Sequence, residues 1–325
     1  MRSDMQTGKA AACVVFCGFF AATHAFADDA RTPQDWIDRM GSAVQVTNYA
    51  GTVVRVREGR VDTFKVVHTV RDGVVREKVV IQDGDGLEII RNGNEVHCIL
   101  PDQESVLVEE WNNQSTLFST LPSSDIRFGN EYDVLLKDFD RVAGRKAAKL
   151  AILPHDHYRY GYRIWLDTET GFPLQTQLIG DDNGALEHVK FAEISIEQDI
   201  RSSALDSSYS IEDWKWYTEP RPTMQREVES EWLAADVPAG FRVLSTQQKI
   251  LPDADDPITH IVYSDGLATV SVFIAPVDDE QTSRRSSVGA SNSYSTVIDG
   301  YRVTAVGQVP QITVEQIAKS MRQSP

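Results

Sequence analysis

The sequence predicts a mainly β protein with packed helices (α+β), divided into two domains. Short runs rich in β-branched residues alternate with turn residues along most of the chain, as in GTVVRVRE, DTFKVVHTV and LEIIRN. A polar stretch with two prolines, residues 206–230, interrupts these runs and is typical of a linker. The 325 residues also exceed what one hydrophobic core comfortably holds.

The first residues have the features of an export signal. Arg2 and Lys9 lie ahead of an apolar run, residues 10–22. That run is shorter than the roughly 20 residues that span a bilayer. Ala25-Phe26-Ala27 has the small-x-small pattern of a signal-peptidase site. We therefore expect residues 1–27 to be removed and the mature chain to be periplasmic, with a transmembrane anchor as the alternative.

Charge and cysteine content limit the class of partner. The formal net charge is −16, and residues 1–27 carry a net +1, so the mature chain has a net charge of about −17. This charge argues against nucleic acid and favours a basic or apolar partner. Cys98 is the one cysteine expected after export, so no internal disulfide is predicted. It is expected as a buried, inert thiol, with a reactive thiol as the alternative.

The first domain, residues 28–205, is predicted to open with a helix. Thr32 can cap it, Pro33 suits its first position, and apolar residues follow at helical spacing. Two series of strands then form antiparallel meanders that should curl towards a barrel or half-barrel. Between the two series, residues 105–133 predict a helix or loop over one mouth of the sheet. Its large apolar residues, Trp111, Leu117, Phe118, Leu121 and Phe128, are candidate cavity or lid groups, with core packing as the alternative.

The stretch YRYGYRIWLD, residues 158–167, interleaves tyrosines with arginines. With a period of two, Tyr158, Tyr160 and Tyr162 share one face of a strand, and Arg159 and Arg163 share the other. An aromatic and basic surface can also stack nucleic-acid bases, but the acidic chain excludes that reading. The stretch predicts a sheet strand.

The second domain, residues 231–325, is predicted as a small sheet packed by one C-terminal helix. Its strand candidates include FRVLSTQQKI, ITHIVYS and ATVSVFIAP, and VDDEQTSRRSSVGASNSYS is expected to be a polar loop. Thr313 is the expected helix cap, with Gln316 placed for a capping box. Arg284 and Arg285 in the loop are either solvated or contact a partner.

Catalytic and metal motifs are weak in this sequence. His155 and His157 could both ligate a metal from one face of a strand, but no third ligand follows at a diagnostic spacing, and a polar turn is the alternative. No nucleophile elbow, zincin helix or phosphate-binding glycine loop is present. We therefore predict a binding protein, with no enzyme activity, no cofactor and no metal.

Several stretches resemble the MucB/RseB family of periplasmic regulators of an envelope-stress (sigma-E/AlgU-type) sigma factor. They are NYAGTVVRVREGRVDTFKVVHTV, DRVAGRKAAKLAILPHD, HYRYGYRIWLDTETGFPLQTQLIGDDNGALEHVKF, PAGFRVLS, VYSDGLATVSVFI and YRVTAVGQVP. The resemblance runs from about residue 33 to about residue 322. Residues 106–133 match weakly, and Trp232-LAADVPAGF differs from the family's more compact entry into the second domain.

The resemblance implies a first domain similar to the lipoprotein carriers LolA and LolB, a half-open β-barrel around an apolar cavity. It implies binding to the periplasmic domain of a membrane-spanning anti-sigma factor (RseA/MucA-like), protection of that domain from proteolysis, and sensing of lipopolysaccharide or lipoprotein acyl chains. Tyr263, Asp265, Gly266 and Leu267 match the family's Y-S-D-G-L turn and are candidate partner contacts, with a simple hairpin as the alternative; Arg284 and Arg285 are the favoured partner contacts. A lipid or lipoprotein carrier or chaperone without a regulatory partner is the alternative, and a homo-oligomer is left open.

Overall fold

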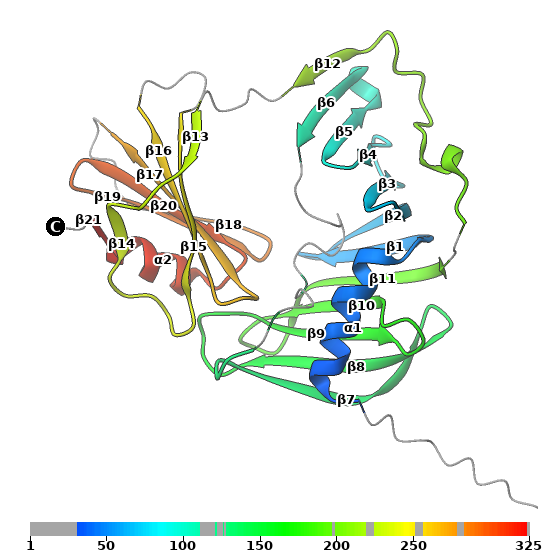
Figure 1. Cartoon of the computed structure of the whole chain (residues 1–325), viewed down its shortest axis with the longest axis horizontal. Helices are drawn as coiled ribbons and strands as arrows, with labels where there is room; N and C mark the ends of the chain where they lie inside the picture. Colours follow the sequence, from blue (N-terminus) through cyan, green and yellow to red (C-terminus); the bar gives the residue numbers. More distant parts are fainter. Residues whose placement is uncertain are drawn as a thin grey trace, which may run out of the picture. The chain divides into compact units, whose positions relative to one another are not determined.

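The computed structural model describes residues 31–110, 121, 126, 128–196, 199–218, 224–250, 256–277 and 283–323. Most of these residues form β-strands, arranged as one large and one smaller sheet with few helices (Figure 1). The predicted fold class is therefore confirmed. No helix within the described ranges has the length and apolar character needed to cross a membrane.

The larger sheet has twelve strands in the order β12-β6-β5-β4-β3-β2-β1-β11-β10-β9-β8-β7. It is not closed, because β12 and β7 lie at opposite ends of this order, as expected for a half-open barrel. Neighbouring strands are antiparallel except for β12, which runs parallel to β6. The strands are β1 (Tyr49–Arg57), β2 (Arg60–Arg71), β3 (Val74–Ile81), β4 (Glu88–Asn92), β5 (Glu95–Leu100), β6 (Ser105–Glu110), β7 (Tyr132–Val142), β8 (Arg145–Pro154), β9 (Gly161–Asp167), β10 (Pro173–Ile179), β11 (Ala185–Ile196) and β12 (Lys215–Thr218).

Helix α1 (Pro33–Val46) packs on one face of this sheet. Thr32 caps it as predicted and forms a capping box with Asp35, which satisfies backbone groups that the first helical turn leaves unpaired. Trp36, Ile37 and Met40 are fully buried in a core cluster with residues of β8, β9 and β10. Figure 1 shows the helix crossing these strands. The helix therefore marks the inner face of the sheet.

Close packing at the centre of the sheet depends on a glycine. A Cβ atom added at Gly51 of β1 would lie 2.5 Å from the carbonyl oxygen of Glu193 in β11. The register between these strands also shifts between Thr52 and Val53. Only a residue without a side chain fits at position 51. The β-bulge beside it is where such a glycine is commonly found.

The tyrosine stretch is a strand only in part. β9 begins at Gly161, and Tyr158, Arg159 and Tyr160 lie before it without strand structure. With a period of two, Trp165 and Asp167 share the face of the arginines, and we expected that face to be mostly polar. This expectation is wrong, because Trp165 and Asp167 are as buried as Tyr162. β9 lies between β8 and β10 in the middle of one half of the sheet, where both faces are covered.

The smaller sheet has seven strands in the order β13-β15-β16-β17-β20-β19-β18, and a two-stranded sheet joins β14 to β21. Helix α2 (Gln311–Ser320) supplies Val314, Ile317 and Ala318 to the core. The strands are β13 (Met224–Glu227), β14 (Trp232–Ala234), β15 (Arg242–Ile250), β16 (Ile258–Ser264), β17 (Thr269–Pro276), β18 (Arg284–Val288), β19 (Ser291–Ile298), β20 (Tyr301–Gly307) and β21 (Met321–Gln323). This part is the predicted sheet packed by one C-terminal helix.

Two local predictions in this part are wrong. Helix α2 begins at Gln311 after Pro310, and Thr313 is not its cap; the fully buried Thr313 hydroxyl donates to the carbonyl of Tyr158 at 2.6 Å. The predicted polar loop contains the hairpin β18–β19, closed by Gly289 with φ +61°. Its serine-rich strand β18 lacks the alternation of apolar and polar residues that predicts a strand, because β18 is exposed throughout.

The predicted linker also contains ordered strands. β12 extends the larger sheet beyond β6, and β13 pairs with β15 of the smaller sheet. Before them, the short 3-10 helix η2 (Ser202–Leu205) precedes residues that cover the larger sheet: Lys78 Nζ donates to the Asp206 carbonyl at 2.7 Å, and Glu88 accepts from the Ser208 amide at 3.1 Å. Another 3-10 helix, η1 (Pro101–Gln103), connects β5 to β6. The polar composition of this stretch therefore gave no sign of β12 and β13, because their pairing partners lie elsewhere in the sequence.

Candidate ligand face and partner surface

The inner face of the larger sheet carries an apolar row beyond helix α1. Cross-strand partners share a face, and the register aligns one residue from each of five neighbouring strands, β2 to β6. These residues are Val66, Val79, Ile89, Cys98 and Leu107. Val66 and Val79 belong to the core cluster beneath α1, and Ile89, Cys98 and Leu107 are half-buried. The row is an apolar surface that leads outward from the core.

A buried polar row runs beside it. His68 Nδ1 lies 2.8 Å from Glu77 Oε2, and both side chains are 1% exposed. Arg91 is the cross-strand partner of Glu77, and its Nε donates to the Gly93 carbonyl at 2.7 Å. Burial lowers the pKa of Arg91, and the charge of Glu77 opposes that shift. The hydrogen-bonded His68–Glu77 pair and the guanidinium thus lie beside the apolar row.

Three atoms of this polar row have no hydrogen-bond partner among the described residues. They are His68 Nε2, Glu77 Oε1 and Arg91 Nη1. Buried polar atoms without partners are costly, so these three atoms are candidates for hydrogen bonds to a bound polar group. A donor and acceptors beside an apolar wall suit the polar end of an amphiphile.

Cys98 gives this face a chemical probe. It is the free cysteine of the described chain and is half-buried. Burial, and then the charge of Glu109, raises the pKa of the Cys98 thiol to about 11. The thiolate is the reactive form, so we expect Cys98 to react slowly near neutral pH, although it is half-buried and not buried as predicted.

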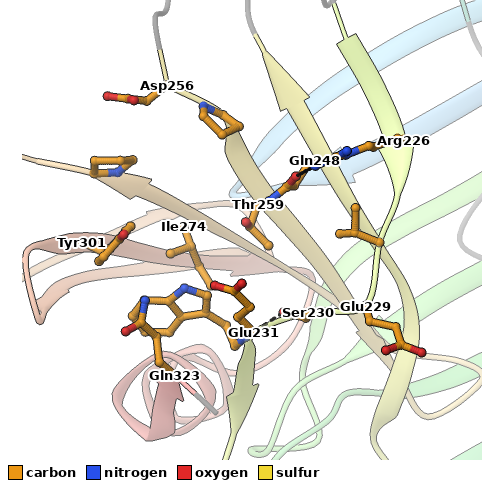
Figure 2. A pocket seen from close by; sticks show the side chains of 14 residues that line it. Arg226, Glu229, Ser230, Glu231, Gln248, Asp256, Thr259, Ile274, Tyr301 and Gln323 are labelled. Atoms are coloured by element: carbon orange, nitrogen blue, oxygen red, sulfur yellow. Dashed lines mark hydrogen bonds between the residues drawn. The ribbon is translucent and has the colours of Figure 1, made fainter. Parts of the chain in front are cut away.

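A separate pocket of about 340 Å³ lies on the smaller sheet (Figure 2). Trp232 and Tyr301 contribute an edge-on ring pair with centroids 5.2 Å apart. Figure 2 shows Glu231 among the central residues and Asp256 at the rim. Acidic residues outnumber Arg226, which donates to Gln248 at 2.8 Å, so the pocket favours a cationic group. Sequence reasoning missed it because the lining segments are far apart in the chain.

Comparison with known families agrees with the two-sheet architecture. The model of the MucB/RseB N-terminal domain matches residues 32–209, and the model of the MucB/RseB C-terminal domain matches residues 226–322. Together these matches cover most of the chain. The chain belongs to the MucB/RseB family.

Relatives within the MucB/RseB family match along nearly their whole length. The sigma factor AlgU regulatory protein MucB of Pseudomonas aeruginosa is 31% identical over 304 residues, which cover 91% of this chain and 92% of the relative. The sigma-E factor regulatory protein RseB of Escherichia coli K12 is 26% identical over 293 residues, covering 88% and 89%.

Solved MucB structures share the fold. A crystal structure of MucB in complex with MucA(peri) has a TM-score of 0.69 at 29% identity and covers 90% of this chain and 100% of that chain. A complex structure of Pseudomonas aeruginosa MucA/MucB has a TM-score of 0.68 at 27% identity and covers 90% and 99%. A crystal structure of MucB has a TM-score of 0.56 at the same 27% identity and covers 90% and 98%.

The candidate lid residues are only partly accounted for in this MucB/RseB chain. Trp111, Leu117 and Phe118 lie outside the described residues. Leu121 and Phe128 are partly buried and pack against the core cluster that contains α1 residues. Phe128 also meets the Tyr132 ring edge-on at 5.6 Å. For these two residues the contacts are those of core packing, and their role as a lid stays a prediction.

The family's Y-S-D-G-L turn lies between β16 and β17 and is more buried than a surface contact requires. The Tyr263 hydroxyl, on β16, accepts from the amide of Ala234 on β14 at 2.9 Å. Asp265 contacts Arg159, and its side chain is 1% exposed. Gly266 adopts φ +101°, and Leu267 packs partly buried beside the α1 core cluster. These four residues therefore have intramolecular contacts that the sequence pattern did not reveal.

The two loop arginines have different surroundings. Arg285 pairs with Glu315 of α2 at 2.5 Å, and this pairing raises the pKa of Arg285. Arg284 lies on the exposed strand β18. Of the two, Arg284 is the better placed to meet a partner, and both remain predicted contacts.

The paired histidines do not form a metal site with other described groups. His155 Nδ1 lies 2.7 Å from the Asn130 carbonyl and Nε2 lies 3.1 Å from Asp133, while the His157 side chain is 84% exposed. No group of three or more metal-ligating side chains was found in the described part of the chain. The turn interpretation fits these contacts.

Proposed function

We propose that this protein is an exported regulator that binds the periplasmic domain of a membrane-spanning anti-sigma factor of the MucA/RseA kind. The observation that carries the proposal is the match of both family models, together with the similarity to MucB structures that contain MucA. The acidic net charge of −16 is compatible with a basic partner surface. The proposal includes the division into domains of residues 28–205 and 231–325, joined by residues 206–230.

The binding test uses the mature chain and the periplasmic domain of an anti-sigma factor encoded beside it. Titration calorimetry should give saturable binding, and that domain should be cut more slowly by a site-one protease when this protein is added. A carrier without a regulatory partner should not retain the anti-sigma domain. Absence of binding at tens of micromolar would refute the regulatory role.

Export can be tested separately. Residues 1–27 lie outside the described residues, so the signal peptide remains a proposal from the sequence. The protein recovered from the periplasmic fraction should begin near Asp28. An intact N-terminus in the membrane fraction would instead support a transmembrane anchor.

We also propose that acyl chains of lipopolysaccharide or lipoproteins bind the inner face of the larger sheet. The apolar row from Val66 to Leu107 supports this, because burying acyl chain stabilises by roughly 0.8 kcal/mol per methylene. The unpartnered atoms of His68, Glu77 and Arg91 support a polar end group beside it.

The lipid proposal is tested with a dansylated fatty acid as the probe. Leu107→Glu introduces a charge into the apolar row and should weaken probe binding at least fivefold. Val61→Glu is the matched control, because Val61 is already 59% exposed. Equal probe affinity in the two variants would place the lipid elsewhere.

A further inference from the structure

A buried arginine joins the larger sheet to the smaller one. Arg159 precedes β9, and its side chain is fully buried. Its Nη1 donates to Asp265 Oδ2 at 2.5 Å, and its Nη2 donates to the Ala239 carbonyl at 2.6 Å. Both acceptors lie in loops of the smaller sheet, whereas Nε contacts Asp156 of its own side at 3.1 Å. One guanidinium therefore uses its donors on both sides of the junction.

Aromatic rings from both sides enclose the guanidinium. Its central carbon lies 5.3 Å from the ring of Tyr132 in β7 and 5.1 Å from the ring of Phe241, next to β15. The Tyr132 hydroxyl also donates to Asp265 at 2.9 Å. Burial lowers the pKa of Arg159, but Asp265, Tyr132 and Asp156 together outweigh burial, so the pKa of Arg159 is raised. We call Tyr132, Asp156, Arg159, Asp265 and the Ala239 carbonyl the Arg159 seat.

The residues on either side of Arg159 contact the smaller sheet as well. The Tyr158 carbonyl accepts from Thr313 of α2 at 2.6 Å. The Tyr160 hydroxyl accepts from Asn292 of β19 at 3.1 Å. Three consecutive residues of one loop thus contact helix α2, strand β19 and two loops of the second domain.

These contacts of Arg159 are better suited to fixing how the two sheets are arranged than to adding free energy of unfolding. Desolvating a buried ion pair offsets much of its attraction, whereas removing one partner leaves the other charge buried and uncompensated. The fork of Arg159 also requires its acceptors in defined directions. An alternative arrangement of the two sheets would therefore have to separate Arg159 from Asp265.

We propose that Arg159 is a positioning residue that holds the two sheets in the arrangement that the anti-sigma partner recognises. The part of this proposal that concerns recognition by the partner rests on the proposed function.

The experiment measures the distance between a spin label on the larger sheet and a second label on helix α2, which packs on the smaller sheet. In a Cys98→Ser background, Val74→Cys on β3 and Ile312→Cys on α2 place labels at exposed sites, 46% and 51% exposed. Arg159→Gln and Asp265→Asn should turn one narrow distance distribution into a broad one. Arg159→Lys, which keeps the charge and loses the fork, should lie between. Arg145→Gln, which breaks a pair within the larger sheet, is the matched control and should stay narrow.

Circular dichroism and affinity for the partner's periplasmic domain are measured on the same variants. Arg159→Gln and Asp265→Asn should stay folded and bind the partner at least tenfold more weakly. A single narrow distribution in both variants overturns the proposal, and so does loss of folding in both, because a positioning role leaves each sheet intact. Broad distance distributions with an unchanged affinity for the partner would show that the partner does not recognise this arrangement, and would overturn that part of the proposal. If wild-type protein does not bind the partner, the proposed function fails, and the distances still decide the role of Arg159.

Discussion

At the scale of single residues, several charged side chains are placed by the turns that they stabilise. Asp167 ends β9 and accepts from Arg145 Nε at 2.6 Å, the Thr170 amide at 2.8 Å and the Glu169 amide at 3.0 Å. Burial raises the pKa of Asp167, but these hydrogen bonds outweigh burial and hold the pKa below its usual value. The sequence places Asp167 in the strand, and the structure makes it the anchor of the following turn.

Asp167→Asn should destabilise the protein by about 2 kcal/mol at neutral pH, because charge-assisted hydrogen bonds are lost. A depressed folded-state pKa stabilises above the unfolded value of about 3.9 and loses that effect as the pH falls through the folded value. The difference from wild type should therefore shrink below about pH 4. Urea unfolding checks this, with Asp199→Asn as control, since Asp199 is 95% exposed. A pH-independent difference would contradict the assignment.

Cys98 should react slowly with Ellman's reagent at neutral pH and faster as the pH rises towards about 11. Unfolding in urea should restore the rate of an ordinary thiol. A bound acyl chain on the apolar row should slow the reaction further. The absorbance of the released thiolate gives the rate, and fast labelling of the folded protein at pH 7 would show that the thiol is not shielded.

At the scale of elements, a helix or strand was predicted correctly when the residues that specify it lie close together in the sequence. Helix α1 was predicted correctly because its cap, first-turn proline and apolar spacing lie within one segment. Helix α2 was predicted with the wrong cap, because Thr313 serves Tyr158 from another part of the chain. The hairpin β18–β19 was missed because its exposed serines carry no hydrophobic period. Apolar periodicity reports burial, so exposed strands escape it.

Met40→Ala should destabilise the protein by about 3 kcal/mol, since it removes a fully buried side chain between α1 and the sheet. Val46→Ala, at a residue 69% exposed on the same helix, should change stability by less than about 0.5 kcal/mol. Thermal or urea unfolding compares the two. Equal effects would mean that α1 does not dock on the sheet through Met40.

At the scale of the whole molecule, the candidate ligand face and the Arg159 seat belong to different parts of the larger sheet. The apolar row lies on β2 to β6, and Arg159 precedes β9. A lipid bound on the apolar row would not contact Arg159 directly, so we propose that it would act on the partner through a change in how the two sheets are arranged. Ligand and partner are linked only if they prefer different arrangements.

A short-chain lipopolysaccharide should lower the affinity for the partner's periplasmic domain at least tenfold, which corresponds to about 1.4 kcal/mol or roughly two buried methylenes. By linkage, the partner should lower the affinity for the lipid by the same factor. Titration calorimetry in both orders measures the two factors. Equal partner affinity with and without lipid would refute the linkage.

The sequence by itself determined the mainly β class, helix α1, most strands of both sheets and the family, because each depends on local periodicity or on short motifs in a fixed order. Only the tertiary structure decided that Arg159 and Asp265, 106 positions apart, form one buried pair, and that His68, Glu77 and Arg91 form one row. The physical reason is that strand register and packing create these neighbours. The sequence pattern predicts the face of a strand or helix on which a residue lies. It does not predict which distant residue contacts it in the folded protein.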